Sequence, residues 1–197
     1  MAKTPAEEYS KKLSNGLIIP TKYGLIDIHN RLIDQSLKTK NIGHYGLRDD
    51  SILDYLCDKL ENHRYKENQE DNAYYVGTEI FFNIACRHPF TDGNKRTAYI
   101  AALAYIAHNF SEICGKNKAF RFFLKKNPKL GQTIETIAKW GEGSNYKSLE
   151  DLISKAGLMG KKSRKLNEED VKRFINFILR NNIQLEKVDK NGKGKEN

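Results

Sequence analysis

Apolar residues recur along this chain mainly at the three- and four-residue spacing of helices. Alternation of apolar and polar positions, which would indicate strands, does not persist over several segments. The spacing predicts long helices over about 22–37, 52–60, 71–86, 94–108 and 168–180, and shorter ones over 119–126, 133–140 and 148–155. We therefore predict an all-α fold, with a helical bundle as core and a helical extension at residues 110–185.

The predicted helix at 94–108 is apolar nearly all round, which is typical of a helix at the centre of a small helical protein. Asn167 is suited to cap the helix at 168–180. Residues 1–21 form an N-terminal segment without a clear pattern. Residues 186–197 are mostly Lys, Asn, Gly and Glu, so we expect a disordered tail there.

The composition narrows the class of protein. The net charge is +9, from 34 Lys and Arg against 25 Asp and Glu. This excess is dispersed through the C-terminal half, so nucleic-acid binding is not favoured as the main function. No apolar run approaches the roughly 18 residues that span a bilayer, and no apolar signal segment stands at the start. We expect a cytoplasmic protein that does not enter membranes, with Cys57, Cys86 and Cys114 as isolated apolar residues.

Candidate chemistry is concentrated in the loop between the two central helices, His-Pro-Phe-Thr-Asp-Gly-Asn-Lys-Arg at 88–96. The N-terminus of a helix presents unpaired N–H groups with partial positive charge, which favours bound phosphate. Gly93 lets the backbone approach such a ligand. Asn94, Lys95 and Arg96 add hydrogen-bond donors on the first turn. The pattern predicts a phosphate site at the start of this helix.

Asp92 and His88 complete this set. A carboxylate beside phosphates makes sense if it holds Mg²⁺, which proteins bind through one or two carboxylates plus substrate phosphates. His88 is the obvious neutral-pH base of the loop. Each residue alone has a simpler interpretation: a structural histidine, a helix cap, surface charges. Together, in this order and spacing, they favour chemistry on phosphate.

The run His-Pro-Phe-x-Asp-Gly-Asn-Lys-Arg-Thr-Ala at 88–98 resembles the signature of the Fic/Doc family. The resemblance covers about residues 22–109 and implies a Fic-like catalytic core there. It implies that His88 takes the proton of a target protein's hydroxyl and that Asp92 holds Mg²⁺. It also implies that Asn94, Arg96 and backbone N–H groups near Gly93 bind the phosphates of ATP or another nucleotide.

The stretch Gly46-Leu47-Arg48-Asp49 is similar to the segment upstream of the signature in Doc-like (death-on-curing) toxins. By resemblance, the stretch Ile42–Arg48, which includes Gly46, Leu47 and Arg48, belongs to a flap that holds the target by strand-like pairing. An ordinary helix–helix connection is the alternative.

This chain departs from the AMP-transferring branch of the family at two positions, which distinguish transfer of phosphate from transfer of AMP. That branch has a glycine where this chain has Lys95, and a second arginine where it has Tyr99. Doc-like members carry the lysine and phosphorylate a threonine of elongation factor Tu. The resemblance therefore favours phosphoryl transfer to Ser or Thr. AMP transfer is the alternative within the family, and a non-catalytic basic binding module is the alternative outside it.

Many Fic proteins carry an inhibitory helix with the pattern Ser/Thr-x-x-x-Glu-Gly/Asn. Glu61, Glu67, Glu142 and Glu196 precede Gly or Asn here, but Cys57, His63, Ala138 and Gly192 stand four residues earlier. No such helix is recognised, so the resemblance implies a separate antitoxin protein as partner. Trp140, between Lys139 and Gly141, is read as a core aromatic residue at a helix end.

Overall fold

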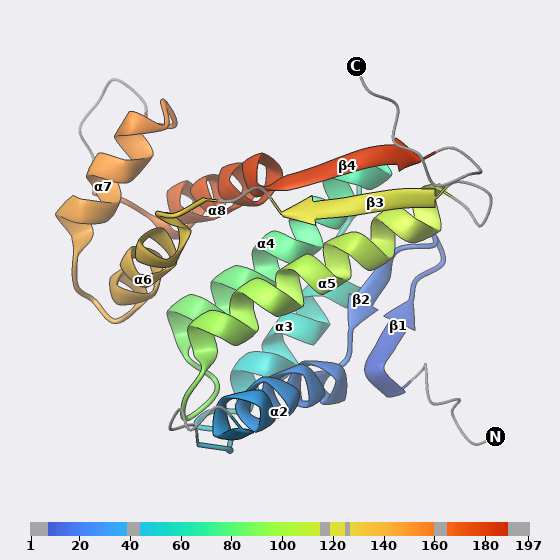
Figure 1. Ribbon diagram of the computed structural model, residues 1–197, viewed down its shortest axis with the longest axis horizontal. Coiled ribbons are helices and arrows are strands. Elements are labelled where there is room, and N and C mark those ends of the chain that lie inside the picture. Colours follow the sequence, from blue (N-terminus) through green and yellow to red (C-terminus); the bar gives the residue numbers. More distant parts are fainter. Residues whose placement is uncertain (1–7, 39–43, 115–118, 125–126, 160–164, 189–197) are drawn as a thin grey trace.

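The fold is helical, as the apolar spacing predicts. The computed structural model describes residues 8–38, 44–114, 119–124, 127–159 and 165–188. Figure 1 shows the arrangement, in which two long central helices are surrounded by shorter ones. The helices are α2 (Lys22–Lys38), α3 (Ser51–Glu61), α4 (Gln69–Arg87), α5 (Asn94–Cys114), α6 (Leu130–Gly141), α7 (Tyr146–Lys155) and α8 (Glu168–Asn182).

Two short antiparallel strand pairs accompany the helices. The first pairs β1 (Ser10–Lys12) with β2 (Ile18–Pro20), and the second pairs β3 (Ala119–Leu124) with β4 (Ile183–Val188). The helix predicted over 119–126 is therefore wrong, because this aromatic-rich run pairs with a distant strand that local spacing does not reveal. β4 also continues three residues into the predicted tail, whose remainder, 189–197, lies outside the described residues.

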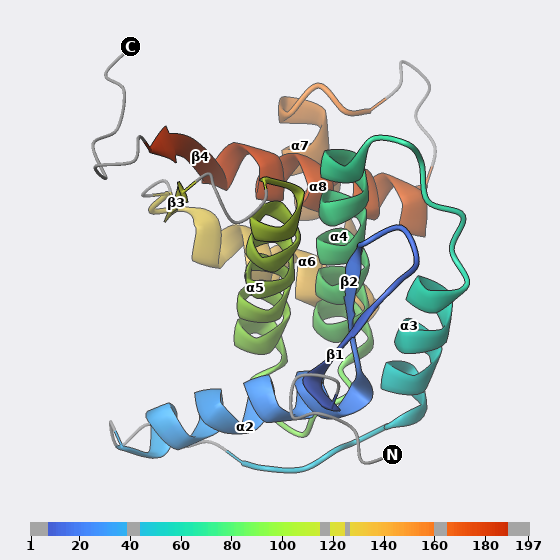
Figure 2. The same cartoon turned by 90° about the vertical axis from the view of Figure 1, so that its right-hand side faces the viewer.

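The core is built around α4 and α5, which lie side by side in Figure 2, with α2 crossing below the end where they connect. Almost all of α4 from Asn72 to Cys86 is buried. The two helices approach closely at Gly77, where an added Cβ would lie 2.5 Å from Cδ1 of Ile106. This packing fixes the connection between α4 and α5, residues 88–93, and with it the whole motif at 88–96.

A buried carboxylate joins three helices across the core. The side chain of Glu79, in the middle of α4, is 3% exposed. Its two oxygens lie 3.1 Å from Nζ of Lys59 on α3 and 3.1 Å from Nζ of Lys172 on α8. Removing one member of such a buried pair leaves an uncompensated charge. The network therefore holds α3 and α8 against α4.

Local signals set the helix ends. Asn167 accepts a hydrogen bond from the N–H of Asp170 and the Asp170 side chain accepts one from the N–H of Asn167, a capping box that confirms the predicted cap of α8. Asp50 stands at the start of α3 without a side-chain cap, and Asp49 accepts from the N–H of Ser51 at 3.1 Å instead.

The C-terminal part forms one layer against α4. α6 and α7 lie together at one end of the molecule (Figure 1), and α8 packs across α4 (Figure 2) and leads directly into β4. Cys86 is buried and Cys57 is partly buried, which confirms their reading as apolar residues. Trp140 packs partly buried against the core, as expected. Within the described ranges, no helix has both the length and the apolarity that crossing a bilayer requires.

Candidate active site

The loop 88–96 lines a cavity together with one residue from outside it. The cavity has a volume of about 260 Å³, and its lining residues are His88, Thr91, Asp92, Gly93, Asn94, Lys95, Arg96 and Glu142. The structure thus brings every candidate of the loop to one place. The residue that the sequence analysis did not place there is Glu142, which follows the last turn of α6.

His88 stands at the point where α4 ends. Its backbone has φ 53° and ψ 59°, the left-handed conformation that ends many helices. This conformation costs a non-glycine residue roughly 1–2 kcal/mol, and such cost is often found at functional sites. It turns the chain out of α4 and sets the imidazole against the cavity. The Nε2 atom is buried without a hydrogen-bond partner and lies 3.5 Å from Oε1 of Glu142.

Phe90 anchors the middle of the loop. Its side chain is buried and stacks on His29 of α2, with ring centroids 3.9 Å apart. His29 shares a hydrogen bond of 3.1 Å with Oγ1 of Thr97. Burial lowers the pKa of His29, which favours its neutral form. His29 therefore supports the loop from α2.

Asn94 clamps the loop onto itself. Its Oδ1 accepts from the N–H of Phe90 at 3.0 Å, and its Nδ2 donates to the carbonyl of Phe90 at 2.7 Å. The side chain is therefore engaged in shaping the loop. Its contact with phosphate stays a prediction. Its role in fixing the shape of the loop was not predicted from the sequence.

Gly93 and Asp92 form the turn before α5. Gly93 has φ +70°, a conformation that glycine adopts without strain. A Cβ there would lie 3.2 Å from Cδ1 of Ile33. The N–H of Gly93 donates to Oδ1 of Asp92 at 2.6 Å. The carboxylate of Asp92 is thereby held at the cavity, beside the first turn of α5.

Lys95 and Arg96 extend from the first turn of α5 in different directions. Nζ of Lys95 lies 2.5 Å from Oε2 of Glu135 on α6. Nη1 of Arg96 donates to Oγ of Ser36 on α2. Both residues are exposed and line the cavity. Tyr99, by contrast, packs against the core, so one turn further along α5 supplies no second cation.

The segment predicted as a flap pairs with the loop. Leu47 and Phe90 form an antiparallel bridge, and the N–H of Arg48 donates to the carbonyl of Pro89 at 2.7 Å. Gly46, at φ +123°, accepts from the N–H of Thr91 at 3.1 Å. Residues 46–48 thus lie beside the site, held by one β-bridge at Leu47 and by backbone hydrogen bonds on either side of it. Ile42 and Gly43, also assigned to the flap, lie outside the described residues.

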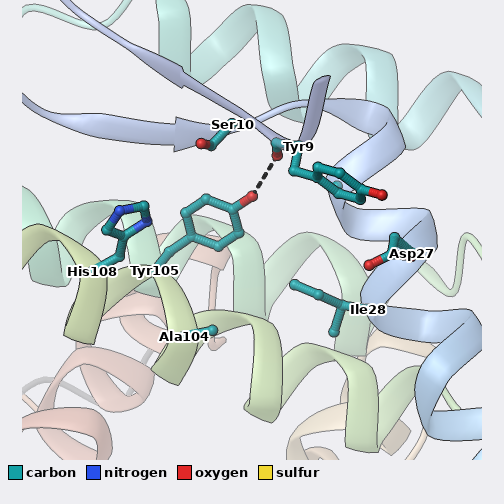
Figure 3. Close-up of a pocket in the computed structure, with 8 residues that line it drawn as sticks. Tyr9, Ser10, Asp27, Ile28, Ala104, Tyr105 and His108 are labelled. Atoms are coloured by element: carbon teal, nitrogen blue, oxygen red, sulfur yellow. Dashed lines mark hydrogen bonds between the residues drawn. The ribbon is translucent and has the colours of Figure 1, made fainter. Parts of the chain in front are cut away.

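A larger pocket lies away from this site. It has a volume of about 350 Å³ and is lined by residues from the N-terminal segment, α2 and α5, with the Tyr105 hydroxyl donating to the carbonyl of Tyr9 at 2.8 Å (Figure 3). Its lining is mainly apolar. It includes Asp27 and His108 but, unlike the cavity at the loop 88–96, no described Lys or Arg that could bind phosphate.

Comparison with known proteins supports the resemblance. The model of the Fic/DOC family matches residues 20–106, somewhat less than half of the 197-residue chain. No curated protein and no solved structure matches the chain significantly. The matched range nearly coincides with the predicted core at 22–109. It supports a nucleotide-dependent transferase that modifies proteins, and it ends before α6, which supplies Glu135.

Proposed function

We propose that this protein transfers the terminal phosphate of ATP to a Ser or Thr hydroxyl of a target protein. The observation that carries the proposal is the convergence of His88, Asp92, Lys95 and Arg96 on one cavity. Lys95 occupies the position where AMP-transferring members have glycine. The position of their second arginine is Tyr99, which packs against the core.

The residues divide the reaction between them. The imidazole of His88 takes the proton of the target hydroxyl, whose oxygen attacks the γ-phosphorus of ATP. The bond between that phosphorus and the oxygen bridging to the β-phosphorus breaks, and ADP leaves. Lys95, Arg96 and the N–H groups that begin α5 bind the phosphate oxygens and stabilise the charge that develops on them.

The donor set fits Mg²⁺ as cofactor. Asp92 offers one carboxylate at the cavity, and a hard cation accepts one protein carboxylate plus phosphate oxygens and water. Among the described residues, no group of three His, Cys, Asp or Glu side chains could hold a metal ion without the substrate. When bound, Mg²⁺ would neutralise phosphate charge. We therefore propose Asp92 as the protein ligand of Mg²⁺.

The segment 46–48 is proposed to hold the target. Its bridge to Phe90 and its hydrogen bonds to Pro89 and Thr91 hold it beside the residues that follow His88, where it could pair with a peptide. By the family resemblance, the target is a translation elongation factor such as elongation factor Tu. The chain would then act as a toxin in the cytoplasm, controlled by a separate antitoxin protein.

The first test is mass spectrometry of a cell extract incubated with the protein, ATP and Mg²⁺, with His88→Ala as control. We expect one protein to gain a single phosphate, with at least about 10²-fold less product for His88→Ala. A gain of AMP would replace the proposal by nucleotidyl transfer. Salt-sensitive binding of DNA or RNA without nucleotide turnover would select the non-catalytic binding module.

A further inference from the structure

The polar surroundings of His88 include a carboxylate that the reaction scheme above does not use. Nε2 of His88 is buried and has no hydrogen-bond partner, and Oε1 of Glu142 lies 3.5 Å away from it. The other charged residues that line this cavity are Asp92, Lys95 and Arg96. A buried ring nitrogen that faces a carboxylate calls for an explanation, because unpaired buried polar atoms are costly.

Tight packing places Glu142 at this position. α6 ends at Gly141, which lies so close to α4 that an added Cβ would be 2.2 Å from the carbonyl oxygen of Cys86. Sγ of Cys86 donates to the carbonyl of Ile137 at 3.6 Å. The N–H of Glu142 then donates to the carbonyl of Ala138 at 3.2 Å. The end of α6 is therefore held against the last turn of α4, directly before His88.

We propose that Glu142 is a positioning residue for His88. Its carboxylate accepts a hydrogen bond from the Nε2–H group of the imidazole, which leaves Nδ1 to take the proton of the target hydroxyl. The separation of 3.5 Å is long for a hydrogen bond, and such contacts commonly shorten when substrates bind. This inference rests on the proposed function.

The charges balance during this step. The hydroxyl proton moves to Nδ1 while Nε2 keeps its own proton, so the ring becomes an imidazolium. The negative charge of Glu142 faces that cation from the side opposite the incoming proton. When ADP has left, Nδ1 returns its proton to water. A carboxylate that orients a histidine and stabilises its charged form is a recurring device in enzymes that use a histidine base.

The experiment is a kinetic double-mutant cycle on the full chain, with phosphate transfer from ATP as readout. Glu142→Ala should lower kcat about 10- to 100-fold, the range expected for losing a hydrogen bond to a charged group, while KM for ATP stays unchanged. Glu142→Gln should retain part of the activity because its amide oxygen still accepts a hydrogen bond. In the His88→Ala background, Glu142→Ala should have no further effect, because it acts only through the imidazole.

Controls separate this inference from the proposed function. Asp151→Ala, at an exposed acid on α7, should leave kcat unchanged. If Glu142→Ala raises kcat, Glu142 obstructs His88 and the inference is overturned. A loss of equal size in both backgrounds would also overturn it, since Glu142 would then act independently of His88. Full activity of His88→Ala alone would instead defeat the proposed mechanism. Thermal unfolding of each variant, with Glu142→Gln as the isosteric change, shows whether lost activity reflects lost folding.

Discussion

Nζ of Lys95 lies 2.5 Å from Oε2 of Glu135, so an ion pair joins the first turn of α5 to a helix beyond the matched family segment. Lys139 approaches the other oxygen of Glu135 at 3.4 Å. The side chains of Lys95 and Glu135 are 48% and 40% exposed. Exposed pairs contribute little to folding stability. We therefore expect the pair to affect ligand binding instead, because Glu135 on α6 competes for Lys95 with any phosphate in the cavity.

Removing the charge of Glu135 should strengthen nucleotide binding. With Glu135→Gln, Lys95 no longer has a competing carboxylate, so the dissociation constant for a non-hydrolysable ATP analogue should fall by about 1.5- to 5-fold. Isothermal titration calorimetry measures this change. Gln132→Ala, at an exposed position of the same helix, is the matched control and should bind as the parent does. Weaker binding by Glu135→Gln would mean that Lys95 does not contact the phosphates.

The same pair predicts a pH dependence of stability. The hydrogen bond from Lys95 lowers the pKa of Glu135 below its ordinary value of 4.5, against the smaller opposing effect of desolvation. A lowered folded-state pKa stabilises the protein above the ordinary value, and this contribution disappears as the pH falls through the lower value. Urea unfolding should therefore show the parent slightly more stable than Glu135→Gln at about pH 7, with the difference lost at about pH 3. An equal difference at both pH values would contradict this.

Gly141→Ala should destabilise the protein because a Cβ would lie 2.2 Å from the carbonyl oxygen of Cys86, and the backbone must shift to accept it. We expect a loss of about 1–3 kcal/mol in the free energy of unfolding, the range for overpacked sites. Gly131→Ala is the control on the same helix, because a Cβ there meets nothing within 4 Å. It should be neutral or stabilise by up to about 1 kcal/mol. Chemical denaturation of the two variants compares them directly.

The backbone of His88 allows its side chain and its conformation to be tested separately. Both His88→Gly and His88→Ala remove the imidazole, so both should lose transferase activity. At φ 53°, however, glycine is not strained, whereas alanine is. We expect His88→Gly to be about 1 kcal/mol more stable than His88→Ala in urea unfolding. Equal stability of the two variants would show that the left-handed backbone at position 88 does not strain a residue that has a Cβ atom.

Local pattern predicted most of the fold and of the loop. The helical spacing placed α4 and α5, Asn167 was recognised as a cap, and the motif placed His88, Asp92 and Lys95 together. These features depend on neighbours in the sequence or on one continuous motif. The predicted phosphate contacts, the magnesium site and the partner proteins stay predictions.

Long-range pairing accounts for what the sequence did not reveal. Glu135 and Glu142 reach the loop only because α6 packs on α4, and no spacing in the sequence marks that contact. β3 and β4 pair across some sixty residues, so the local pattern of β3 was read as a helix. The sequence pattern predicted Asn94 as a donor to phosphate. It did not show that the same amide hydrogen-bonds the backbone of Phe90, because short polar side chains have both options and the sequence does not distinguish them.

The anchoring of Phe90 has a consequence for how the loop moves. Its N–H and carbonyl are both bound by Asn94, its ring is stacked on His29, and Leu47 pairs with it across the flap. Opening the loop at this residue would break all of these contacts together, so its amide should exchange hydrogen with solvent only through a larger, cooperative unfolding event. The loop is then ordered before any ligand arrives, and nucleotide binding need not expend free energy on ordering it.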